Sequence, residues 1–60
     1  MEVSKYLEKY VKIDLENGFF YEGIVIDYDY DSITLLDKKE KNVTILLKFI
    51  TFIREVDKNG

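Results

Sequence analysis

The sequence predicts an all-β protein, a small and strongly bent five-stranded antiparallel barrel. Three observations predict it: an Asn17-Gly18 pair between two apolar runs, a long segment with Gly23 inside it, and an apolar stretch over residues 43–56. A chain of 60 residues makes one domain. We expect that domain to span 1–60, with a helix over 2–9, the barrel over 11–56 and a tail over 57–60.

A short N-terminal helix is predicted by apolar residues at Val3, Tyr6, Leu7 and Tyr10, which have the spacing i, i+3, i+4 and i+7. A helix of about eight residues is not stable alone in water. We therefore expect it to dock against one open end of the barrel.

The strands follow in order. Apolar and polar residues alternate over 11–15, which indicates a half-buried strand. Asn17-Gly18 comes next and indicates a tight hairpin, because both residues tolerate positive φ. The second strand runs from Phe19 to about Tyr30 and bends at Gly23, where the missing side chain lets the backbone curl. A third short strand is expected over 33–35, and a charged turn over 37–42.

Residues 43–56 are mostly apolar and do not alternate, and Lys48 indicates a break into two strands. Strands without alternation are covered on both faces. A barrel of this size cannot cover both faces of its last two strands with its own residues, so we predict obligate association with other chains. The predicted interface consists of Val43, Ile45, Leu47, Ile50, Phe52 and Ile53.

Charge and composition exclude several classes of function. The net charge is −3, and no Lys or Arg occurs over 13–37, which argues against broad attraction to nucleic-acid phosphates. With no Cys and no His, the chain lacks the usual nucleophile–base pairs and metal ligands, so we expect neither an enzyme nor a metal or cofactor site. No apolar run has the length of a membrane span and no signal peptide is evident, so we expect a cytoplasmic protein without membrane contact.

The spacing Asp27-x-Asp29-x-Asp31 resembles the opening of a calcium-binding loop. Such a loop needs glycine at its sixth position and glutamate at its twelfth. Ser32 and Lys38 occupy those positions here. We therefore interpret the segment as a solvated acidic turn.

One family resemblance adds to these expectations. Val11-x-Ile13-x-Leu15-x-Asn17-Gly18 and Gly23-x-Val25-x-x-Tyr28-Asp29 resemble the first motif of the Sm-like (LSm and Hfq) family, and 50–53 resembles the core of the second. The resemblance covers about residues 2–56. It implies a five-stranded SH3-like barrel whose fourth strand pairs with the fifth strand of the next copy, giving a homo-hexameric or homo-heptameric ring.

The resemblance also implies binding of single-stranded, U- or A-rich RNA, with a role in RNA processing or in assisting RNA pairing. Base stacking, base-edge hydrogen bonds and a phosphate contact would come from the loop after the second strand and from the loop around Lys48. The implied RNA-binding residues are Tyr28, Asp29, Tyr30, Asp31, Ser32 and Lys48.

The pattern departs from the family where RNA would bind. The Arg-Gly pair of the second motif falls on Leu46 and Leu47, and Ser32 replaces the Asn of many family members. The sequence does not settle six against seven subunits, homomeric against mixed rings, or which RNA is bound. An alternative therefore stays open: a self-associating structural or protein-binding module of the same fold with no RNA-binding role.

Overall fold

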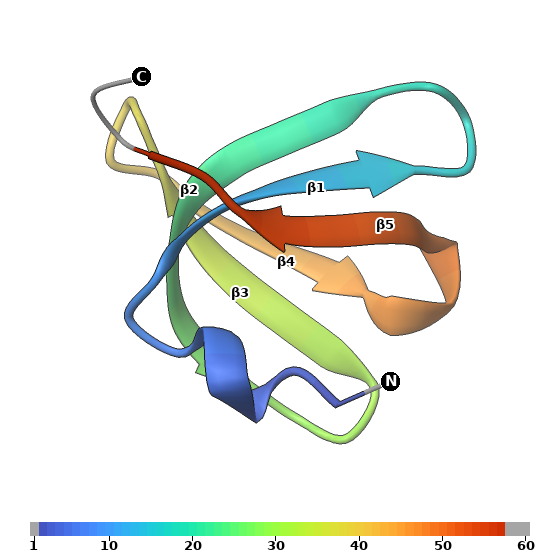
Figure 1. Cartoon of the computed structure of the whole chain (residues 1–60), viewed down its shortest axis with the longest axis horizontal. Helices are drawn as coiled ribbons and strands as arrows, with labels where there is room; N and C mark the ends of the chain where they lie inside the picture. The colour runs from blue at the N-terminus through green and yellow to red at the C-terminus, as the bar shows by residue number, and fades with distance from the viewer. Residues whose placement is uncertain (1, 58–60) are drawn as a thin grey trace.

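The computed structural model describes residues 2–57, which form one five-stranded antiparallel sheet with the order β4-β3-β2-β1-β5. The elements are η1 (Ser4–Tyr6), β1 (Tyr10–Leu15), β2 (Phe20–Tyr28), β3 (Ser32–Asp37), β4 (Asn42–Leu46), η2 (Leu47–Phe49) and β5 (Ile50–Glu55), where η marks a 3-10 helix. Figure 1 shows the sheet curling around its concave face, with β2 bent so that it borders both β1 and β3. The predicted all-β, barrel-like class is confirmed.

The N-terminal helix is much shorter than the predicted 2–9. Only Ser4–Tyr6 is helical: the backbone leaves the helical conformation at Leu7, which has a ψ of 131°, and Glu8 follows with a φ of 67°. The Glu8 amide donates to the Val25 carbonyl (2.8 Å), and the Val25 amide donates to the Lys9 carbonyl (3.0 Å). The prediction failed because these residues pair with β2, and backbone bonds to a neighbouring strand replace those of a marginal helix.

The hairpin between β1 and β2 forms at the predicted Asn17-Gly18 pair. Gly18 has a φ of 90°, a conformation that costs glycine little. The Asn17 side-chain oxygen accepts a hydrogen bond from the Phe19 amide (3.0 Å), and the Gly18 amide donates to the Leu15 carbonyl (3.0 Å). The local chemistry of the turn therefore fixes the register of β1 against β2.

Strand β2 ends two residues earlier than predicted and carries two irregularities. A Cβ atom on Gly23 would collide with the Leu36 carbonyl of β3, so the sheet packs closely where only glycine fits. The register with β3 shifts between Val25 and Asp27. A bulge of this kind increases the local twist and bends the strand.

The core lies on the concave face of the sheet. Val11 and Ile13 of β1, Val25 of β2 and Ile33 and Leu35 of β3 are fully buried. Each of these side chains contributes about 1.5–3 kcal/mol through removal of apolar surface from water. The remaining buried apolar residues are Val3, Ile45 and Ile53, with Tyr6, Leu15, Val43, Leu47 and Ile50 packed against them.

The apolar stretch over 43–56 divides at Lys48, as predicted: η2 separates β4 from β5. Both strands are edges of the sheet, and in the part of the chain that the structure describes no ladder joins them. No helix over residues 2–57 is long and apolar enough to cross a membrane.

Candidate functional site

The barrel is open on one side, where an apolar cavity of about 490 Å³ lies between the β1–β2 hairpin and β4. We call this cavity the barrel mouth. It is lined by Leu15, Glu16, Asn17, Tyr21, Val43, Thr44, Ile45, Leu46 and Phe49. Its volume falls within the range of about 300–1,000 Å³ that is usual for binding pockets.

Hydrogen bonds of the hairpin and of η2 hold the walls of the mouth in place. The Leu15 amide donates to the Phe19 carbonyl (2.8 Å) and closes the hairpin. The Glu16 amide donates to the Phe49 carbonyl (3.0 Å), which ties the hairpin to η2. The mouth is therefore built on bonded backbone rather than on a free loop, and its shape is pre-formed.

Most of the side chains that line the mouth are apolar, and several of them are partly exposed. Tyr21 is 39% exposed and Phe49 is 43% exposed, although both are aromatic. Glu16 is the only charged residue in the lining. Exposed apolar surface that is concave and rimmed by polar groups is typical of sites that bind another molecule.

One wall of the mouth is the free edge of β4. The Asp37 amide donates to the Lys41 carbonyl (3.0 Å), and the Leu47 amide donates to the Asp31 carbonyl (2.9 Å). In this register, the odd-numbered residues of β4 are the ones whose backbone groups bond to β3. In an antiparallel pair the bonding direction alternates along the strand. The backbone N–H and C=O groups of Thr44 and Leu46 therefore point away from β3, into the open edge.

The structure brings the two segments of the predicted RNA site together through the bond from the Leu47 amide to the Asp31 carbonyl. Tyr28 is 42% exposed at the end of β2, and Tyr30 is 89% exposed in the loop that follows. Ser32 begins β3 and is half-buried. The cation of this set, Lys48, lies with its Nζ 5.3 Å from the centre of the Phe49 ring.

The aspartates of this region have local backbone partners. An Asp27 carboxylate oxygen accepts from the Tyr28 amide (2.9 Å), and one of Asp29 accepts from the Tyr30 amide (2.7 Å). Short-range bonds of this kind are common for aspartate in turns. No group of three or more potential metal ligands occurs among the described residues.

The predicted oligomer interface needs correction. Ile45 (6% exposed) and Ile53 (9% exposed) belong to the core of the chain itself, so they are not available to another copy. Val43, Leu47 and Ile50 pack against the same core, and only Phe52, at 54%, is strongly exposed. The expectation that the chain cannot cover these strands was too strong, because the sheet curls and takes their inner residues into its concave face.

Sequence reasoning missed the residues that line the mouth opposite β4. Tyr21 was assigned to a strand without a role, although it lies on the same face as Gly23 and Val25. That alternation was a usable signal, since Tyr21 is paired with the buried Ile13. Its exposure had no signal in the sequence, because it depends on the gap between strands that lie far apart along the chain.

Comparison with known proteins shows one feature, the fold. No protein-family model matches the chain, and no curated protein matches it. Among solved structures, the chain is similar to one from a study described as "Structural basis of the Dcp1:Dcp2 mRNA decapping complex activation by Edc3 and Scd6", with a TM-score of 0.83 and 23% identity. The match covers 98% of this chain and 64% of the other chain.

These findings correct the predicted function. The structural neighbour comes from a complex of different proteins and not from a ring of identical chains on RNA. The prediction of a ring-forming, RNA-binding protein of the Sm, LSm or Hfq kind is therefore wrong, and the alternative, a protein-binding module, has the better support. The motif resemblance itself is tested by no family model and stays a prediction.

Proposed function

We propose that this chain is a protein-binding module that takes an extended segment of a partner protein at the free edge of β4, with apolar side chains of that segment in the barrel mouth. The observation that carries the proposal is the position of the open backbone groups of Thr44 and Leu46 beside an exposed apolar cavity. Backbone bonds along the edge give affinity in this mode of recognition, and pockets beside the edge give specificity.

The structural comparison supports a protein partner. The matched chain belongs to a study of the Dcp1:Dcp2 decapping complex and its activation by Edc3 and Scd6, in which proteins act on one another. The match covers only 64% of the other chain, so nothing about that whole protein is transferred as a fact. We include in the proposal that the partner belongs to the decapping machinery and that the protein is cytoplasmic.

The size of the site sets the expected strength. Strand β4 has five residues, and a segment paired along it buries a small area beside the mouth. Interfaces below about 1,200 Å² are typical of weak and transient complexes. We therefore expect fast exchange between the free and bound states, which suits detection by NMR.

The test uses the isotope-labelled chain and the terminally blocked peptide Lys-Thr-Val-Thr-Leu-Thr-Val-Thr-Lys. The alternating sequence favours an extended conformation, and the lysines suit Glu16 at the rim of the mouth. Amide shifts are expected along Asn42–Leu46 and at Tyr21 and Phe49. A peptide N-methylated along one edge is the control, since it cannot donate to β4.

Two pairs of variants separate the edge from the cavity. Thr44→Pro removes an N–H group from the free edge without breaking the β3 ladder, and should abolish binding, whereas Thr44→Val loses the same hydroxyl contact to Thr34 (2.9 Å) and should bind. Phe49→Ser should weaken binding, and Phe19→Ser, at a residue that is 70% exposed and outside the mouth, should not. Equal binding by Thr44→Pro and Thr44→Val in folded protein would contradict strand addition.

A further inference from the structure

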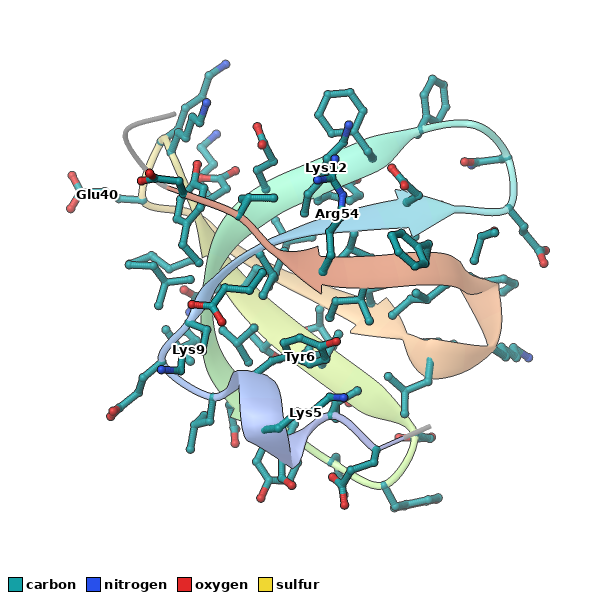
Figure 2. All side chains as sticks on the ribbon, in the orientation of Figure 1. Lys5, Tyr6, Lys9, Lys12, Glu40 and Arg54 are labelled. Atoms are coloured by element: carbon teal, nitrogen blue, oxygen red, sulfur yellow. The ribbon has the colours of Figure 1, made fainter. Side chains whose placement is uncertain are left out.

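A second surface lies on the convex side of the sheet, where β5, β1 and β2 are neighbours. Lys12 of β1 is directly opposite Arg54 of β5, and Figure 2 shows the two cationic groups next to each other. Residues directly opposite in an antiparallel ladder project from the same face, and like charges there are destabilising. The fold therefore places two cations where they repel each other.

Neither carboxylate on this face, Asp14 or Glu22, forms an ion pair with Lys12 or Arg54. Glu22, which is opposite Lys12 on the other side, is bound to Lys38 at 3.6 Å. Lys12 instead places its Nζ 4.4 Å from the centre of the Phe20 ring. Neither carboxylate of this face is therefore bound directly to Lys12 or Arg54, and the two cations stay exposed to a further negative partner.

Exposed aromatic side chains flank the two cations. Asp14, two residues after Lys12, is opposite Phe20 on β2 and opposite Phe52 on β5. Phe20 and Phe52 are each 54% exposed. We call this surface, formed by Lys12, Arg54, Phe20 and Phe52 around Asp14, the Lys12–Arg54 face.

We propose that the Lys12–Arg54 face binds a segment of a partner protein that carries a single carboxylate with apolar side chains beside it. The carboxylate would lie between the two cations and relieve their repulsion, and the apolar side chains would cover the two phenylalanines. The inference rests on the proposed role in protein binding and assigns a second surface to it.

Charge decides between a peptide and a nucleic-acid strand as the occupant. The face itself has two cations, Lys12 and Arg54, and one carboxylate, Asp14, and the neighbouring Glu22 and Lys38 neutralise each other. The face therefore carries one net positive charge on a chain whose total charge is −3. A polyanion would meet Asp14 between the aromatic rings as well as the negative field of the whole chain. A segment with one carboxylate can place its single negative charge between the two cations, and its apolar neighbours bring no further negative charge close to Asp14.

The experiment titrates the isotope-labelled full chain with the terminally blocked peptide Ser-Leu-Ser-Asp-Ser-Leu-Ser. Amide and side-chain shifts are expected at Lys12, Arg54, Phe20 and Phe52. Replacement of the aspartate by asparagine, or of both leucines by serine, should remove these shifts. Equal shifts with the asparagine peptide would overturn the proposal.

Variants of the chain give the second readout. Lys12→Gln and Arg54→Gln should each weaken peptide binding by about two- to fivefold, as expected for loss of one exposed ion pair. Both should leave the fold intact, since each removes a repulsion. Lys5→Gln is the matched control: Lys5 also lies over an aromatic ring, with its Nζ 5.3 Å from the Tyr6 centroid, but far from this face.

The remaining outcomes each decide against a carboxylate-bearing peptide segment as the occupant of this face. Peptide-induced shifts confined to Asn42–Leu46 would overturn this proposal while leaving strand addition at β4 in place. Displacement of the peptide by oligouridylate, with shifts at the same residues, would make the occupant a nucleic acid. Sedimentation that shows self-association lost in Arg54→Gln would make it a second copy.

Discussion

The backbone carbonyl of Leu36 lies in the space that a side chain on Gly23 would occupy. The contact joins β2 to β3 at the point where Gly23 is opposite Asp37 and Ile24 is opposite Leu36. Because the obstacle is backbone rather than the end of a flexible side chain, the neighbouring strand cannot yield without disturbing the ladder. This approach allows β2 to bend and border both β1 and β3.

Gly23→Ala should therefore destabilise the fold severely. We expect a loss of about 3 kcal/mol or more, because the added methyl group overpacks a site formed by backbone. Chemical denaturation monitored by tyrosine fluorescence measures the loss. Gly18→Ala is the control: it meets no atom within 4 Å, so it carries only the cost of its positive φ, about 1 kcal/mol. Similar losses for the two variants would show that the Leu36 contact is unimportant.

Replacement by serine should lower the stability of the fold at one residue of β5 and leave it almost unchanged at the adjacent one. Ile53→Ser removes a core side chain and should cost about 2–5 kcal/mol, which is enough to unfold a marginal domain of this size. Phe52→Ser changes a residue that is 54% exposed and should leave the stability within about 0.5 kcal/mol. Circular dichroism melting curves distinguish the two. Unfolding of the Phe52 variant at the same temperature as the Ile53 variant would show that both faces of β5 are buried.

Glu2 should titrate below its ordinary range in the folded chain. Its carboxylate accepts hydrogen bonds from the Ser4 hydroxyl (2.6 Å) and the Ser4 amide (2.9 Å), and these bonds to the charged form lower the pKa. A lowered folded-state pKa means that the bonds stabilise the fold above the unfolded-state pKa and that this contribution disappears as the pH falls through the folded-state value. Carboxyl carbon shifts in an NMR titration measure the pKa directly.

Ser4→Ala is the matching variant for that titration. It removes the hydroxyl bond, which is the largest cause of the shift, and retains the amide bond. The pKa of Glu2 should rise toward its ordinary value but not reach it. An unchanged pKa in this variant would assign the shift to the amide alone.

Local backbone chemistry made the hairpin, the bend and the strand break predictable from sequence. Asn17-Gly18 accepts positive φ, Gly23 removes a side chain, and Lys48 interrupts an apolar run, and each effect acts within a few residues. The helix was overestimated because its periodicity is also local, whereas the competing bonds to Val25 come from a distant strand.

The candidate surfaces were less accessible to sequence reasoning. The apolar run over 43–56 indicated a contact surface, but it did not show that Ile45 and Ile53 turn inward while Leu46 and Phe52 turn outward. In the same way, Lys12 and Arg54 are 42 positions apart in the chain and meet only through the β1–β5 register.

The amino-acid sequence by itself thus determined the fold class, the tight turn, the bend and the division of the last apolar segment. Only the tertiary structure decided which side chains enter the core, which strand edges stay open and which charges face each other. The physical reason is that turn and bend preferences belong to single residues, while facing and exposure depend on pairing between strands that are distant along the chain.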